Sequence, residues 1–276
     1  MKPLRAPMTS VPMNDRAAPV APRFDAVLIG NDVSRAEAAV AAAGGRVGRR
    51  VEWRGELDVA GSAVLVIEAE GMDEAALEQV LPDVARFAAD RGLKVVAAAD
   101  IQAIDLVAAW LWGPGVELLV RPSLPDRIDA LLRVGAPATL SGDAFREEEV
   151  PAFGVEPPAG PPPDAAELRR AIRTRRMREA FFMPGLFADP AWDMLLDLYA
   201  AELEGEPVSV SSLCIAAAVA PTTALRWIAR MTEDGLLERR PDESDRRRAF
   251  MALTDVARVG MRGYLEAVRR AGLGIA

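Results

Sequence analysis

The sequence of 276 residues contains no histidine and only one cysteine, Cys214. Without imidazole, the chain lacks the usual general base of hydrolases and the commonest zinc ligand, and a lone thiol cannot form an intramolecular disulfide. No apolar run approaches the roughly 18–20 residues of a membrane span, and the first residues lack the apolar core of a signal peptide. The sequence therefore predicts a cytoplasmic protein without enzymatic activity, metal, cofactor or membrane partner.

The negative charge of the chain is unevenly distributed. The net charge is −8, with 16 basic and 24 acidic residues in positions 1–160 and 17 of each in positions 161–276. The acidity belongs to the first half, so a neutral second half can still present arginines to nucleic acid on one face. The length suits about two domains at roughly 100–200 residues each.

Two proline-rich stretches without apolar periodicity divide the chain. The stretch 138–163 holds six prolines and the acidic run at 147–149, which is typical of a semi-extended linker. Residues 1–22 hold five prolines and are expected to form a tail. The predicted domains are therefore 23–137 and 164–276.

The first domain alternates short, continuous apolar runs with helical spacing. Such runs are typical of strands buried on both faces of a parallel sheet, so the pattern predicts a doubly wound α/β domain. The expected strands are 26–29, 63–67, 93–97 and 116–120, with a weaker one near 47–53, and helical spacing covers 34–43, 73–90 and 101–112.

The second domain has the element order of a winged helix-turn-helix. Its expected helices are 164–182, 192–204, 210–219, 221–234 and 255–271, with a strand–turn–strand ribbon at 236–254. Asp164 and Ser209 are suited to cap helices, and Gly235 is suited to end one. The order helix, helix, turn, helix, wing, helix predicts a mainly α domain that places one helix in the major groove.

Two segments carry the side chains expected to touch DNA. On the helix 221–234, short hydroxyls and arginines lie opposite an apolar stripe, and the tip of the ribbon carries three consecutive arginines that are suited to phosphates and the minor groove. The expected DNA-facing residues are Thr222, Thr223, Arg226 and Arg230 on the helix and Arg246, Arg247 and Arg248 on the ribbon, and the expected inward stripe is Ala224, Trp227, Ile228 and Met231. The alternative for the helical arginines is an ordinary solvated face.

The ribbon resembles the wing of MarR-type regulators. The segments 235–240, 241–247 and 253–254 resemble that family's pattern of Gly-Leu-(Ile/Val)-x-Arg, a short Asp-containing turn, Asp-x-Arg and a closing Leu-Thr. The resemblance implies that Arg247 enters the minor groove, that Asp245 orients the wing by ion pairing, and that Ser211, Thr222, Thr223 and Arg226 meet the major groove and its phosphates.

The same resemblance implies a homodimer held by the outermost helices, 164–182 and 255–271. The expected apolar seam on the second helix is Val256, Val259, Gly260, Tyr264 and Val268. Six arginines between positions 169 and 178 depart from the family pattern. They either contact DNA phosphates or form a solvated face.

The first domain resembles the receiver domain of response regulators, most clearly at 116–123. Phosphoryl transfer there requires an acidic pair for Mg²⁺, an acceptor aspartate, a hydroxyl and a lysine. The matching positions hold Asp32, then Glu68, then Ala97 or Ala98, then Arg121, which predicts a degenerate receiver-like pocket that is not phosphorylated. The domain then serves either as a dimerisation scaffold or as a docking surface for a protein partner.

Together these features predict a transcriptional regulator that binds double-stranded DNA as a homodimer. Two alternatives remain: an adaptor that uses the winged helix to dock a protein, and a two-component regulator that responds to phosphorylation.

Overall fold

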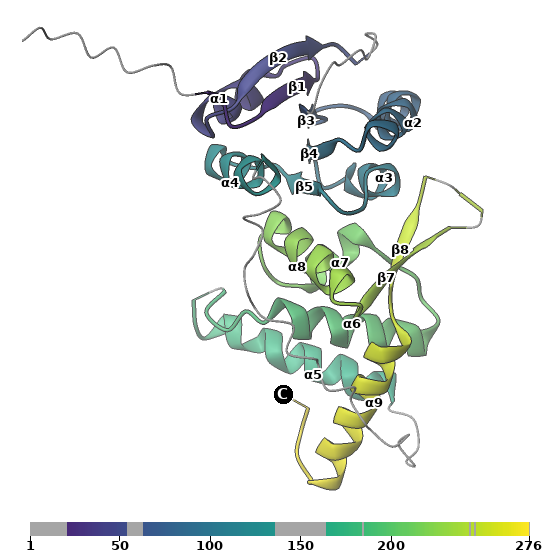
Figure 1. Cartoon of the computed structure of the whole chain (residues 1–276). Coiled ribbons are helices and arrows are strands. Elements are labelled where there is room, and N and C mark those ends of the chain that lie inside the picture. Colours follow the sequence, from purple (N-terminus) through teal and green to yellow (C-terminus); the bar gives the residue numbers. More distant parts are fainter. Residues whose placement is uncertain are drawn as a thin grey trace, which may run out of the picture.

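The computed structural model describes residues 21–53, 63–135, 164–183, 185–242, 244–245 and 247–275. Residues 1–20 of the expected tail and the whole expected linker lie outside this description. The remaining residues form an α/β part and a mainly helical part that contact each other directly (Figure 1).

The α/β part contains the expected parallel sheet. Its five strands lie in the order β2-β1-β3-β4-β5, which is the order of doubly wound flavodoxin-like sheets. The elements are β1 (Asp25–Ile29), α1 (Ser34–Ala42), β2 (Arg46–Val51), β3 (Ala63–Glu68), α2 (Glu74–Arg91), β4 (Lys94–Ala99), α3 (Ile104–Trp110), β5 (Val116–Val120) and α4 (Leu124–Gly135).

Alternate residues of the strands supply two separate apolar layers, because side chains point to opposite faces along a strand. Leu28, Val66 and Leu119 pack with α1 and α4 on one face. Ile29 and Ile67 pack with α2 and α3 on the other face, where the core continues into the helical part of the chain. The sheet is therefore covered on both sides, and one of its covers is shared with the second domain.

The helical part follows the expected winged-helix order, with one short additional strand. Its three strands form an antiparallel sheet in the order β6-β8-β7. The elements are α5 (Ala165–Met177), the 3₁₀ turn η1 (Arg178–Ala180), α6 (Pro190–Glu204), β6 (Val208–Ser209), α7 (Val210–Ala216), α8 (Pro221–Glu233), β7 (Leu237–Pro241), β8 (Ala249–Leu253) and α9 (Asp255–Arg270).

Local side-chain chemistry sets several of these helix ends. The carboxylate of Asp164 accepts a hydrogen bond from the Ala166 amide at 3.0 Å, and the Ser209 hydroxyl accepts one from the Ser212 amide at 3.2 Å. Gly235 has φ +71°, a left-handed conformation that favours glycine after the end of a helix. These three positions agree with the sequence pattern.

The packing of α8 corrects one expectation. Trp227 is 40% exposed, although its helical spacing placed it on the inward stripe. Ala224, Ile228 and Met231 are buried as expected, but Thr222 and Leu225 are also buried, on the side of the helix that faces β5. Because β5 covers one side of α8 and the rest of the helical part covers another, the buried face of α8 is wider than the predicted apolar stripe. Trp227 lies outside this buried face.

The α7–α8 pair lies between the sheet and α6, and the β7–β8 ribbon extends alongside α3 (Figure 1). The helix-turn-helix and the wing thus face the α/β part of the same chain.

In the described part of the chain, no single helix has the length and apolar character of a membrane span. Only α7 and α8 taken together meet both conditions, and these two helices are bent by 108° relative to each other.

Candidate nucleic-acid interface

Ser211 lies in the first turn of α7, where sequence reasoning placed a DNA contact. Its backbone amide donates to Asp105 Oδ1 at 2.8 Å, and its hydroxyl donates to Asp105 Oδ2 at 2.5 Å. Asp105 belongs to α3 of the α/β part. One carboxylate therefore binds both the amide and the hydroxyl of Ser211, a residue that the family resemblance assigned to DNA.

Thr222 lies in the first turn of α8 and is 6% exposed. Its Oγ1 accepts a hydrogen bond from the Val120 amide at 3.1 Å and donates one to the Val120 carbonyl at 3.2 Å. Val120 ends β5, which is an edge strand of the sheet. The hydroxyl thus satisfies two backbone groups of that edge, and in this arrangement it does not reach DNA.

The other expected DNA contacts of α8 are more accessible. Thr223 is half-buried, and Arg230 is exposed and donates to Asp234 Oδ2 at 2.8 Å. Arg226 is half-buried and lies near the first turn of α4. In that turn, a hydrogen bond from the Ser123 hydroxyl lowers the pKa of Asp126, and the charge of Arg226 lowers it to a smaller extent. Among the described residues, Arg226 Nε and Nη2 have no hydrogen-bond partner.

The described tip of the wing is organised around Asp245. Arg247 donates to both carboxylate oxygens of Asp245, at 2.7 and 2.8 Å, and Arg248 lies 3.8 Å from the same group. The hydrogen bonds from Arg247 lower the pKa of Asp245 to about 2. A third nitrogen of Arg247 donates to Glu78 of α2 at 2.8 Å. Arg246 lies outside the described residues.

A half-buried arginine of β7 makes a contact that the sequence pattern did not reveal. Arg239 Nη2 donates to the carbonyl of Ala109 in α3 at 2.5 Å, and burial lowers the pKa of Arg239. Asp105 and Glu78 were also missed as partners of the DNA-facing residues. They stand on helices of another domain, and helical spacing within one domain carries no information about such contacts.

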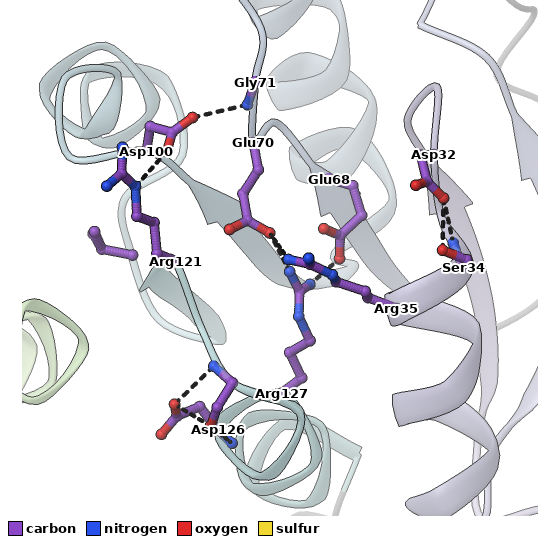
Figure 2. Close-up of polar contacts among 12 residues, drawn as sticks. Asp32, Ser34, Arg35, Glu68, Glu70, Gly71, Asp100, Arg121, Asp126 and Arg127 are labelled. Carbon is purple, nitrogen blue, oxygen red and sulfur yellow. Dashed lines mark hydrogen bonds and ion pairs between the residues drawn. The ribbon is translucent and has the colours of Figure 1, made fainter.

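The three residues of the expected receiver-like pocket lie in three separate interactions (Figure 2). Asp32 accepts hydrogen bonds from the amide and hydroxyl of Ser34, at 3.0 and 2.7 Å. Arg121 donates to Asp100 Oδ1 at 2.7 Å. Glu68 forms a buried ion pair with Arg127 of α4. Among the described residues, no hydrogen bond or ion pair joins any two of Asp32, Glu68 and Arg121.

Arg127 is the residue that sequence reasoning missed at this site. It is 3% exposed and pairs with both Glu68 and Glu70, between which it lies in Figure 2. The sequence did contain an indication of its burial, because the helical spacing of α4 places Arg127 on the same apolar stripe as Leu131 and Val134. An arginine on such a stripe requires a buried partner.

Burial raises the pKa of Glu68 to about 6, although the neighbouring Arg127 guanidinium opposes the shift. The cavity beside this pair has a volume of about 10 Å³, room for one water at most. The described residues include no group of three or more side chains suited to hold a metal ion.

Treatment with acetyl phosphate and Mg²⁺ is expected to leave the mass of the protein unchanged. Arg127 occupies the carboxylate of Glu68, and Arg121 is turned to Asp100 instead of to an acceptor. The Glu68→Asp variant is expected to remain unmodified as well. Intact-mass spectrometry measures both proteins, and an added phosphoryl group on the wild-type chain would favour the two-component alternative.

Residues 194–257 match the family model described as a winged helix DNA-binding domain. This range runs from α6 into the start of α9 and includes α7, α8 and the wing. The helical part of the chain therefore contains a winged-helix domain of the DNA-binding class. No curated protein sequence matches the chain.

The chain is also similar to solved structures of bacterial proteins. MepR of S. aureus, described as bound to ethidium bromide, is 14% identical, with 39% of this chain and 72% of that chain covered and a TM-score of 0.27. The transcriptional regulator Tm0710 from Thermotoga maritima is 24% identical, with 39% and 75% covered and a TM-score of 0.24. BpsR of Bordetella bronchiseptica is 24% identical, with 41% and 83% covered and a TM-score of 0.23.

Proposed function

We propose that the protein is a sequence-specific DNA-binding transcriptional regulator of the MarR type that acts as a homodimer. The carrying observation is the match of residues 194–257 to a winged-helix DNA-binding domain. The domain presents α8 and an arginine-bearing wing in the order that such domains use to enter the major and minor grooves. Thr223, Arg226 and Arg230 of α8, with Arg247 and Arg248 of the wing, are the side chains we assign to DNA.

Exposed apolar side chains support the homodimer. Phe181 is 76% exposed and Met183 is 74% exposed, in the segment that follows η1. On α9, Val256, Val259 and Tyr264 of the expected seam are exposed, whereas Val268 is buried within the chain and does not belong to that seam. Adjacent apolar side chains of this size are unfavourable in water, and a second copy would cover them.

Selection of bound fragments from sheared genomic DNA with the full-length protein tests the proposal. We expect a small set of enriched sites with pseudo-palindromic symmetry, because a two-fold dimer reads two half-sites. The affinity for an enriched duplex is expected to fall with salt, with about 0.9 counterions released for each phosphate neutralised. If a folded protein enriches no sequence and binds no duplex at low salt, the proposal is wrong.

Arg226→Ala is expected to weaken binding to an enriched duplex and to relax the preference for one base pair. Arginine in a major-groove helix binds two acceptors of guanine, which a phosphate contact does not reproduce. Binding to duplexes that carry all four base pairs at each position measures the effect. An equal loss on every duplex would assign Arg226 to a phosphate instead.

The double variant Phe181→Ser/Phe182→Ser is expected to be monomeric at concentrations where the wild-type protein is a dimer, because both exposed rings leave the proposed contact. Analytical ultracentrifugation measures the mass of each species. The control is Ile215→Ser on α7, which removes an apolar side chain that is 69% exposed but lies outside the proposed dimer surface. An unchanged dimer in the double variant would contradict this surface.

One observation favours a second candidate, an adaptor that uses the winged helix to bind protein. Ser211, Thr222 and Arg247 contact the α/β part of the same chain through their side chains, so this surface does bind protein groups. An adaptor would bind no duplex at any salt concentration. The selection experiment therefore separates the two candidates.

A further inference from the structure

We propose that the α/β part of the chain is an intramolecular inhibitor that competes with DNA for one side of the winged-helix surface. The competing surface is formed by α2, α3, the end of β5 and the first turn of α4. On this view the structure is the closed state, and tight DNA binding follows separation of the two parts. The inference rests on the proposed function of the winged helix.

The start of α8 is the first point of competition. Both hydrogen bonds of the Thr222 hydroxyl go to the backbone of Val120. A recognition helix enters the major groove with its N-terminal residues, so β5 fills the space that DNA would need there. The contact also covers the open edge of the sheet, which gives the closed state a stabilising role of its own.

Acidic side chains provide the second and third points. Asp105 binds the amide and hydroxyl of Ser211, and Glu78 binds Arg247 at the wing tip. These carboxylates place negative oxygens where a DNA backbone would place phosphate oxygens. The charge of the α/β part agrees, since its described residues, 21–53 and 63–135, hold 16 acidic and 11 basic side chains, a net charge of −5. The acidic half of the protein thus acts as an internal substitute for nucleic acid.

Two features make the closed state separable. Arg226 Nε and Nη2 are buried without a hydrogen-bond partner among the described residues, which is unfavourable for a charged donor. In addition, a cavity of about 310 Å³ is lined by residues of both parts, among them Trp112 and Leu118 of the α/β part and Leu225 and Ala229 of α8. Groups that line a cavity lose the dispersion contacts that a fully packed interface would supply. On this proposal, DNA supplies acceptors to these two nitrogens, which have no partner among the described residues.

Two substitutions on the α/β part test the inference without changing any residue assigned to DNA. The full-length variant Glu78→Ala/Asp105→Ala loses three hydrogen-bond contacts with the winged helix. We expect it to bind a duplex enriched from genomic DNA at least about tenfold more tightly than the wild-type protein. Hydrogen exchange of residues 116–122 and 221–226 is expected to be faster, because the β5–α8 contact opens.

The control is Asp83→Ala/Asp90→Ala on α2, which removes the same charge from exposed positions. Its affinity is expected to stay within about twofold of wild type, so that a general electrostatic effect is separated from opening. If the first variant binds no more tightly than the control, the inhibitor proposal is wrong while the DNA-binding proposal stands. If all three folded proteins bind no duplex, both proposals are wrong.

Discussion

Replacing Arg127 by leucine is expected to lower the free energy of unfolding by about 3–5 kcal/mol at neutral pH, since breaking a buried ion pair leaves an uncompensated charge. Glu68 would remain in the core of the sheet domain, where both partners are more than nine-tenths buried. Urea denaturation followed by circular dichroism measures the change. The matched variant Arg133→Leu, on the exposed side of the same helix, is expected to have little effect.

The same experiment has a pH dependence whose sign follows from Glu68. Its pKa is about 6 in the folded protein against 4.5 ordinarily, so the folded state binds the proton more tightly. The stability that this group contributes is complete below about pH 4.5 and is lost as the pH rises through about 6. The destabilisation by Arg127→Leu is therefore expected to be smaller at pH 5 than at pH 7.

The double variant Arg127→Leu/Glu68→Leu provides the decisive comparison. Removing both charges leaves no buried ion without a partner, because Glu70 is partly exposed and also lies 3.9 Å from Arg35, so most of the lost stability is expected to return. A double variant as unstable as Arg127→Leu would mean that the loss comes from packing of the arginine stem and not from the stranded carboxylate.

The second large effect is expected from Arg247→Ala, which should weaken binding to an enriched duplex by roughly tenfold or more while leaving the fold intact. The side chain is half-exposed and its guanidinium is held by Asp245, so the wing presents it in one orientation. Fluorescence anisotropy at physiological salt measures the affinity. Arg240→Ala, an exposed arginine of β7 paired with Glu238, is the control and is expected to bind normally.

Arg247 also contacts Glu78 in the closed state, so the substitution removes an inhibitory contact together with the proposed DNA contact. Repeating the measurement in the Glu78→Ala background separates the two effects. The loss caused by Arg247→Ala is expected to be larger in that background, because the inhibitory contact is already absent. An equal affinity of folded Arg247→Ala and wild type in both backgrounds would remove Arg247 from the DNA interface.

The sequence by itself predicted the elements that depend on local chemistry. Continuous apolar runs identified the strands of a parallel sheet, and the capping residues Asp164 and Ser209 located the starts of two helices. The wing was predicted because its glycine, turn and alternating strand residues lie within twenty positions of one another. In each case the interaction that fixes the structure lies within the segment.

Only the tertiary structure decided which partner each functional side chain has. Thr222 has the sequence position of a DNA contact, but the edge of β5 binds its hydroxyl. Glu68 stands where an acceptor carboxylate was expected, but Arg127, 59 positions away, neutralises it. Trp227 follows an inward spacing and is nevertheless exposed, since a second domain covers another side of α8. Contacts between segments so distant in the chain depend on how the domains pack, and the spacing of residues along one helix or strand does not encode that packing.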